Sequence, residues 1–184
     1  MEKTIVISNT SPLINLGMAN ALNLIPSLFP EEGFEVVIPT EVINEIKPPL
    51  KNKVKEMQNE GHIIISPFFI SSVMNSVIPI AQEIAMNAKT WEPEQHYTEA
   101  YVIVKGEQAK LSLGSAFVLI DEKDAKTIAK QKGLRVMNHI DIIRECVRKE
   151  IITQDDGLHL LETLVSKGIK YRSGMLEHYK NEWS

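Results

Sequence analysis

Cysteine is nearly absent from this sequence of 184 residues, which contains only one, Cys146. A lone cysteine cannot form a disulfide within the chain, so the fold has to rely on a packed core, and the length is sufficient for one. Cys146 falls in the helix-like segment HIDIIRECVRKE. A packed, inert thiol is the expected state there in preference to a nucleophile, and we assign it no function.

Long apolar stretches are also missing. The first segment, MEKTIVIS, lacks the basic and apolar regions of a signal peptide and begins directly with a strand-like pattern. The most apolar later stretch, residues 67–86, is interrupted by serine, asparagine, proline and a charged residue, so it falls short of a membrane-spanning helix. We therefore expect a soluble, cytoplasmic protein that does not bind membranes.

Positive charge is not in excess, because the formal net charge is -4. A protein that holds nucleic acid mainly by bulk electrostatics is normally basic, so the charge argues against that class. It does not exclude a nuclease. A carboxylate-lined metal site contributes negative charge of its own, and only the surface around such a site has to be basic.

Short apolar runs alternate with helix-like segments along the chain. Strands are expected at TIVIS (4–8), FEVVIP (34–39), HIIIS (62–66), AFVLI (116–120) and LRVM (134–137). Helices are expected after residue 11, at 21–30, from 40, at 94–110, 122–133 and 140–150, and in the tail. Because each strand is an unbroken apolar run, the pattern predicts an α/β fold with a parallel sheet covered on both faces.

Local signals place the helix starts and the domain limits. Ser11 followed by Pro12 predicts an N-cap and a first helical residue, and Thr40 is the expected cap of the helix in PTEVINEI. Residues 67–94 are less regular and are interpreted as an insertion, helical in part. Residues 155–184 form a C-terminal helical extension. Since no repeat or flexible linker is visible, we expect residues 1–184 to form a single domain.

Polar side chains follow the predicted strands at the edge where parallel sheets bind ligands. Residues 9–11 (Asn-Thr-Ser) follow the first strand, Asp121 and Glu122 follow the fourth, and residues 138–139 (Asn-His) follow the fifth. An acidic pair at a strand end is typical of a catalytic site. A helix N-terminus that favours acids through its dipole explains the pair equally well.

Two further acids, Glu45 and Glu99, lie on predicted helices near this edge. Carboxylates that cluster repel one another and their pKa values rise unless a divalent cation offsets the charge. Mg²⁺ and Mn²⁺ suit oxygen ligands, and they assist phosphodiester hydrolysis by activating water and stabilising charge on the phosphate. The acids thus indicate metal-dependent phosphodiester chemistry.

Several stretches resemble one known family. VISNTSPLINL is similar to the opening of PIN-domain nucleases, in which a strand ends in Asp-Thr-Ser before a hydrophobic helix, and VVIPTEVINEI resembles their second strand and acid-bearing helix. FVLIDEKDAKTIAKQKGLRV and LETLVSKGIKYRSGMLEHY resemble later parts of the PilT N-terminus or VapC-like toxin type, in particular its subgroup with serine and proline in the first motif. The resemblance covers most of the chain outside residues 67–94. It implies a PIN-like Rossmannoid three-layer α/β/α fold with extra C-terminal helices.

The resemblance also implies which residues form the site. The catalytic positions carried over are Asn9, Glu45, Glu99 and Asp121, and those implied to bind Mg²⁺ or Mn²⁺ are Asn9, Glu99, Asp121 and Glu122, supported by Thr10 and Ser11. The subgroup usually has Gly-Glu-Ala-Glu-Ala where this chain has Tyr-Thr-Glu-Ala-Tyr around Glu99. Glu107, in GEQAK, is the rival match, but it lies too close to the next strand to leave room for a helix.

The resemblance implies an endoribonuclease, specifically the toxin of a toxin–antitoxin or related defence module, with RNA as substrate and a small antitoxin protein as partner. A homodimer is a further expectation. Asn9 departs from the family pattern, because asparagine offers one neutral acceptor where aspartate offers two anionic ones. It is either a deliberate inactivating Asp→Asn change or a natural feature of an inactive binding or regulatory protein. We favour the first, since the other acids are intact.

The polar residues next to these acids do not require a catalytic role. His139 could touch a phosphate, but a histidine at a loop–helix junction is more often a surface or capping residue. Lys123 and Lys126 are candidate RNA contacts and, with Lys130, recur at helical spacing beside the acidic pair, although a solvated helix face accounts for them too. A phosphoacceptor domain needs an aspartate after the third strand, where this chain has Ser66, and is set aside.

Overall fold

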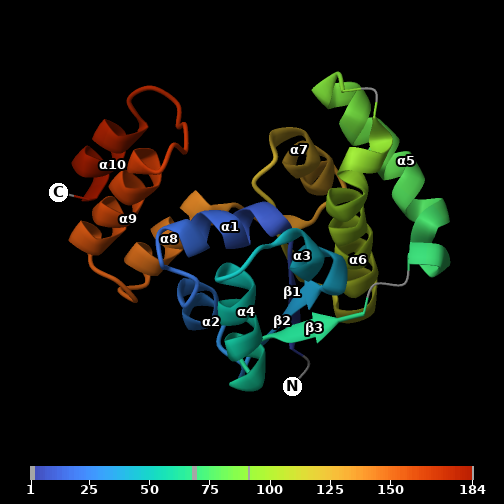
Figure 1. The fold of residues 1–184 in the computed structure, drawn as a ribbon, viewed down its shortest axis with the longest axis horizontal. Helices are drawn as coiled ribbons and strands as arrows, with labels where there is room; N and C mark the ends of the chain where they lie inside the picture. Colours follow the sequence, from blue (N-terminus) through green and yellow to red (C-terminus); the bar gives the residue numbers. More distant parts are fainter. Residues whose placement is uncertain (1–2, 68–69, 91, 184) are drawn as a thin grey trace.

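The computed structural model describes residues 3–67, 70–90 and 92–183. Its centre is a five-stranded sheet in the order β3-β2-β1-β4-β5 (Figure 1). The strands are β1 (Thr4–Ser8), β2 (Phe34–Pro39), β3 (Ile64–Ser66), β4 (Ala116–Leu119) and β5 (Arg135–Met137). All four neighbouring pairs are parallel. The expected α/β fold with a parallel sheet is therefore confirmed.

Helices lie on both faces of this sheet (Figure 1). They are α1 (Thr10–Met18), α2 (Leu24–Leu28), α3 (Thr40–Glu45), α4 (Leu50–Asn59), α5 (Ile70–Ala88), the 3-10 turn η1 (Pro93–His96), α6 (Tyr97–Leu113), α7 (Lys123–Gln131), α8 (His139–Arg148), α9 (Gln154–Ser166) and α10 (Met175–Trp183). The C-terminal helices α9 and α10 lie together at one end of the molecule, as the sequence predicts for 155–184.

Alternation along the strands divides the core into two parts, because successive side chains of a strand point to opposite faces. Val6 of β1 and Leu119 of β4 pack with α1, α2 and α8. Their neighbours Ile7 and Val118 pack with α5, α6 and α7 on the other face. β4 is apolar and buried along its whole length, whereas β2 and β5 also carry the charged residues Glu35 and Arg135.

Two helix starts differ from the prediction. Helix α1 begins at Thr10, with Asn9 in the cap position, so the expected cap at Ser11 is wrong. The Asn9 side chain makes no capping bond because it is engaged with Glu99. Thr40 is the first residue of α3, and its hydroxyl donates to the Ser66 carbonyl at 3.0 Å, which ties α3 to β3.

The segment from 67 to 94 is more regular than the sequence suggests. Its part from Ile70 to Ala88 is one helix of 19 residues, while 68–69 and 91 lie outside the described residues. Val77, Ala81 and Ile84 of this helix are buried in the same cluster as α6 and α7. Residues of the predicted insertion therefore contribute to the core of the sheet's second face.

The environment of Cys146 agrees with the expectation of a packed, inert thiol. Cys146 is buried, its Sγ lies 3.8 Å from the Leu24 carbonyl oxygen, and burial raises the pKa of its thiol to about 11. Such a thiol is protonated at neutral pH and is a poor nucleophile. Within the described ranges, no helix is long and apolar enough to cross a membrane.

Gly106 is the point of closest approach between α6 and β4, and it gives a test of this packing. A Cβ built on Gly106 lies 2.8 Å from Val118 Cγ1 and 3.0 Å from Leu134 Cδ1, whereas one on Gly33 meets nothing within 4 Å. Alanine normally favours a helix by about 1 kcal/mol over glycine. Overpacking typically costs about 1–3 kcal/mol, so Gly106→Ala is expected to lower the free energy of unfolding.

Chemical denaturation measures this difference. Gly33→Ala is the control and is expected to change the free energy of unfolding by less than about 0.5 kcal/mol, the usual range for surface substitutions. A Gly106→Ala protein more stable than the parent would show that α6 and β4 are not in close contact.

Candidate active site at the carboxyl edge of the sheet

Asn9 joins two elements that are far apart in the sequence. It directly follows β1, is 1% exposed, and its backbone N–H donates to the Leu119 carbonyl of β4 at 2.9 Å. Its side-chain Nδ2 donates to Glu99 Oε1, in the first turn of α6, at 3.2 Å. The side chains of Asn9 and Glu99, both predicted site residues, therefore meet at the carboxyl edge of the sheet, where they are largely shielded from solvent.

Two oxygens of this pair have no hydrogen-bond partner among the described residues. They are Asn9 Oδ1 and Glu99 Oε2, and both atoms are buried. Buried polar atoms are nearly always satisfied, so two such acceptors on one bonded pair need an explanation. Burial raises the pKa of Glu99, the hydrogen bonds to its backbone and to Asn9 oppose the shift, and the nearby charge of Glu45 adds to it.

Glu45 lies at the end of α3 and reaches the same region. The Thr10 hydroxyl donates to Glu45 Oε2, and the Thr98 hydroxyl donates to Oε1 at 2.6 Å. Thr10 follows Asn9 and Thr98 precedes Glu99, so these bonds hold the Glu45 carboxylate beside the Asn9–Glu99 pair. The structure thus brings three of the predicted catalytic positions together.

Asp121 is held by a separate group of donors. Its Oδ1 accepts the backbone N–H of His139 at 2.9 Å, and its Oδ2 accepts Asn15 Nδ2 at 2.5 Å and lies 2.9 Å from His139 Nδ1. Asp121 and His139 side chains are 12% and 8% exposed. An aspartate that accepts from Nδ1–H leaves Nε2 of the neutral ring as an acceptor. In that tautomer both ring nitrogens of His139 have a partner, Asp121 for Nδ1 and Tyr171 for Nε2.

The imidazole continues this chain of contacts to the C-terminal part of the molecule. His139 Nε2 lies 3.1 Å from the Tyr171 hydroxyl, and the two rings stack with centroids 5.9 Å apart at 29°. Burial raises the pKa of Tyr171, and the charge of Asp121 and the neighbouring Tyr179 raise it further. The phenol therefore stays protonated and can donate to Nε2.

The remaining predicted residues lie around these two groups. Glu122 caps α7, since its Oε1 and Oε2 accept the backbone N–H groups of Asp124 at 3.0 Å and Ala125 at 2.5 Å. The helix-terminus interpretation accounts for its position. Glu107 lies near the other end of α6 and pairs with Lys132 at 3.3 Å. It is separated from Glu99 by two helical turns, or roughly 12 Å of helix.

Sequence reasoning overlooked Asn15, Thr98 and Tyr171, and it left His139 off the catalytic positions. Asn15 had a signal, because it is a polar residue in the otherwise apolar helix SPLINLGM. Thr98 had a weaker one as the neighbour of Glu99. Tyr171 lies 32 residues from His139 in the sequence. No local pattern connects those two residues.

The chemistry of the donors fits a hard divalent cation in part. Asn9 Oδ1 and Glu99 Oε2 are oxygen ligands without a protein partner, as Mg²⁺ and Mn²⁺ prefer. The Asp121 and Glu45 oxygens already accept protein hydrogen bonds. Within the described part of the chain, no group of three or more His, Cys, Asp or Glu side chains is arranged to hold a metal ion.

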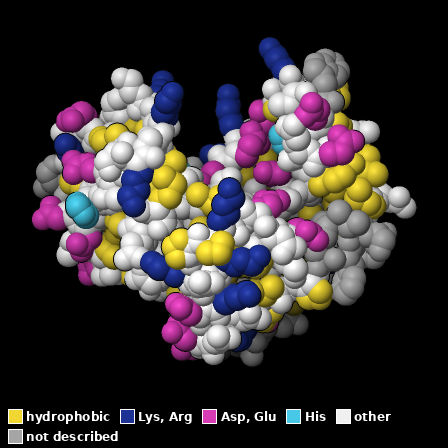
Figure 2. All heavy atoms as spheres, in the orientation of Figure 1, with side chains coloured by type: hydrophobic (Ala, Val, Ile, Leu, Met, Phe, Trp, Pro, Cys, Tyr) yellow, Lys and Arg dark blue, Asp and Glu magenta, His cyan; other side chains and the backbone are white. Residues whose placement is uncertain are grey.

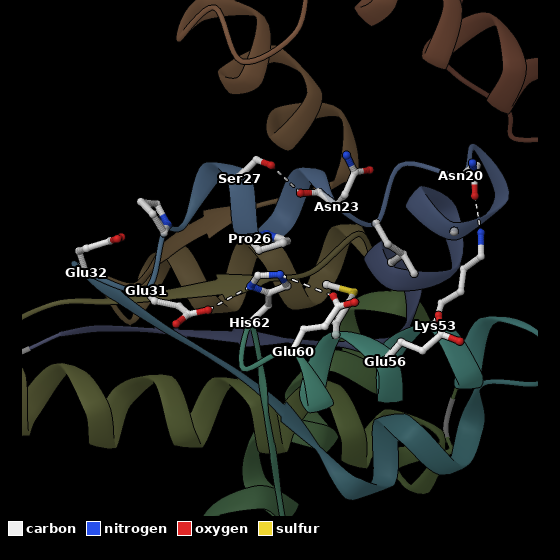
Figure 3. Close-up of a pocket in the computed structure, with 14 residues that line it drawn as sticks. Asn20, Asn23, Pro26, Ser27, Glu31, Glu32, Lys53, Glu56, Glu60 and His62 are labelled. Atoms are coloured by element: carbon white, nitrogen blue, oxygen red, sulfur yellow. Dashed lines mark hydrogen bonds and ion pairs between the residues drawn. The ribbon is translucent and has the colours of Figure 1, made fainter.

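A cavity of about 720 Å³ between α2 and α4 is distinct from this site (Figure 3). Its side chains pair with one another. Figure 3 shows His62 between two acids, with Nδ1 3.0 Å from Glu31 Oε1 and Nε2 3.6 Å from Glu60 Oε2, and the Lys53 ammonium donates to Asn20. None of the predicted site residues lines this cavity. We assign it no chemistry.

Comparison with known proteins identifies a family for nearly the whole chain. A search of curated proteins gave no match. The model of the PIN domain family matches residues 5–184, which is nearly the whole chain. The chain belongs to the PIN domain family.

Proposed function

We propose that this chain carries the site of a divalent-metal-dependent endoribonuclease in which Asn9 replaces the first acidic ligand, so that the chain as written is inactive or nearly so. PIN domains are generally nucleases. The observation that carries the proposal is the Asn9–Glu99 hydrogen bond, whose two other oxygens are buried and unpartnered among the described residues. An acceptor pair of this kind is expected where a cation belongs and no protein donor is supplied.

In this proposal Asn9 Oδ1 and Glu99 Oε2 hold Mg²⁺ or Mn²⁺, with Asp121 completing the acidic site. The bound cation would supply an activated water and stabilise the negative charge that develops on the phosphate. Thr10 and Thr98 orient the Glu45 carboxylate through their hydroxyls. Asn15 and His139 fix the Asp121 carboxylate, and fixed ligands lower the cost of assembling a metal site.

Compared with an aspartate, the asparagine at residue 9 changes the charge of the Asn9–Glu99 pair more than its shape. Its amide donates to Glu99 and lowers the pKa of that carboxyl, so it provides part of the compensation that a cation would give. An aspartate in the same position would place a second buried carboxylate beside the first. Two such anions repel strongly and bind a divalent cation more tightly than an amide and a carboxylate do.

A second candidate function is a catalytically inactive PIN-like protein that binds RNA or regulates a partner. The same hydrogen bond favours it, because it satisfies one oxygen of Glu99 without any metal. The resemblance to the toxin subgroup supports a cytoplasmic toxin whose partner is a small antitoxin protein, with a homodimer as a further proposal. Restoring the carboxylate distinguishes an impaired nuclease from a protein that never cleaves.

Restoration of activity is the first test. Asn9→Asp is expected to cleave single-stranded RNA in Mn²⁺ or Mg²⁺ at least about 100-fold faster than the chain as written, because loss of even an outer metal partner costs about 10–100-fold. A labelled RNA and denaturing gel electrophoresis measure the rate. EDTA should abolish cleavage.

The matched control is Asn9→Asp combined with Asp121→Ala. This double variant keeps the carboxylate at residue 9 and removes that of Asp121, so it should cleave RNA no faster than the chain as written. If Asn9→Asp cleaves no RNA with either metal, while it folds like the parent, the nuclease proposal fails and the binding function is favoured.

Stabilisation by metal is a second, activity-independent test. In EDTA, Asn9→Asp should melt below the chain as written, since two buried carboxylates then face each other. Saturating Mn²⁺ should restore it, and a concentration of 100 times the dissociation constant stabilises a protein by about 2.7 kcal/mol, or roughly 5–11 °C for a chain of this size.

Thermal denaturation at several Mn²⁺ concentrations measures that shift. The control, Asn9→Asp with Glu99→Gln, removes the second carboxylate and should lose most of the response to Mn²⁺. An equal response in both variants would place the metal elsewhere in the molecule.

A further inference from the structure

One side chain of the segment that joins α9 to α10, residues 167–174, contacts the candidate active site. Tyr171 is partly buried and its hydroxyl meets His139 Nε2 at 3.1 Å, one contact away from Asp121. Its neighbours Lys170 and Arg172 are both exposed. Anchoring of Tyr171 therefore presents two cationic side chains to solvent close to the candidate site.

A second group of cations lies on α7, directly after the acidic pair. Lys123 is the first residue of α7 and is exposed, and Lys126 lies one helical turn later. Figure 2 shows the molecule hollowed between the α9–α10 segment and α7, with Lys and Arg side chains on both rims and Asp and Glu side chains on its wall. Asn9 and Asp121 follow the carboxyl ends of β1 and β4, at the edge of the sheet where α1 and α7 begin (Figure 1).

Some of the other cations in the C-terminal half are neutralised by a nearby acid. Lys132, Arg144, Arg148 and Lys180 each pair with a glutamate. Within the described ranges, Lys123, Lys126, Lys170 and Arg172 form no ion pair. Their charge is not compensated locally, and the two elements that carry them lie on opposite sides of the hollow in Figure 2.

We propose that Lys170 and Arg172 on one rim, and Lys123 and Lys126 on the other, bind the backbone phosphates of an RNA strand that crosses the hollow. Tyr171 is a positioning residue, which holds the first rim in place through His139. This inference rests on the proposed function and adds the surface that binds the substrate. The sequence suggested RNA contacts for Lys123 and Lys126 of α7 alone. The inference adds the C-terminal extension to the same RNA-binding surface.

The chemistry of the four side chains suits this role. Lysine and arginine contacts to phosphates position a nucleic acid and do not read its sequence. Arginine can bind a phosphate in a bidentate manner, and lysine acts as a point charge. The anionic acids below such rims would repel the strand unless cations flanked them, so two cationic rims are needed to bring a phosphodiester to the site.

RNA affinity of the chain as written tests the proposal without interference from cleavage. Fluorescence anisotropy with a labelled single-stranded RNA is measured in EDTA over a range of salt concentrations. Lys170→Ala with Arg172→Ala should weaken binding about tenfold at low salt and reduce the log–log salt slope by about 1.4, since each phosphate contact contributes about 0.7. Lys123→Ala with Lys126→Ala should give the same change from the other rim.

The matched control is Lys51→Ala with Lys55→Ala on α4, which lies beyond α1 in Figure 1. It removes the same charge and should leave the affinity and slope unchanged. Arg172→Lys should keep the slope because the charge remains. Tyr171→Phe keeps every charge and most of the ring packing, so it should weaken RNA binding severalfold without lowering the melting midpoint.

Equal affinities for the rim variants and the α4 control would overturn the inference, as would an unchanged salt slope. Cleavage by Asn9→Asp tests the proposed function separately. If that variant cleaves RNA and the rim substitutions change neither affinity nor slope, the nuclease proposal stands and the assignment of this surface fails. The inference would also be refuted if the rim substitutions weakened binding to an acidic protein but left the affinity for RNA unchanged.

Discussion

The hydrogen bond between the Asn9 amide and the Glu99 carboxylate is the contact on which the candidate site depends. Asn9 is fixed at the end of β1 by its backbone bond to β4, and Glu99 is fixed in the first turn of α6. A carboxylate this deeply placed has lost water, and burial raises its pKa. A donor or a cation has to compensate for that loss, and in this chain residue 9 supplies the donor.

Because of this contact, an amide at residue 9 is compatible with the arrangement of the neighbouring acids. An amide and a carboxylate have nearly the same shape, so the backbone around residue 9 need not move. The hydroxyls of Thr10 and Thr98, each adjacent to one partner, then direct Glu45 toward the pair. Asp121 is positioned independently by Asn15 and His139. The geometry of the acids and the capacity for catalysis are therefore separate properties of this chain.

The sheet and the end residues of its strands followed directly from the sequence, because short apolar runs buried on both faces are characteristic of parallel strands. The positions of Asn9 after β1 and Asp121 after β4 came with it. Side-chain partners were harder to predict, since the bond from Tyr171 to His139 joins segments whose own sequences carry no sign of each other. Residues 67–94 were expected to be a less regular insertion, helical only in part, yet burial of one face supports a helix of 19 residues within them. Tertiary packing outweighs local propensity in such a case.

The net charge of -4 does not describe the electrostatic potential at the candidate site, because that potential depends on where the charges lie. Several acids are occupied by capping α7 or by pairing with Lys132, Arg148 and Lys180, and these contribute little potential at the site. The acids at the sheet edge lie below a hollow whose rims carry lysine and arginine. Screening limits the effect of exposed charges to about 8–10 Å, so a phosphate entering the hollow responds to those rims and not to the sum over the chain. An acidic protein can therefore present a cationic entrance to a cluster of acids.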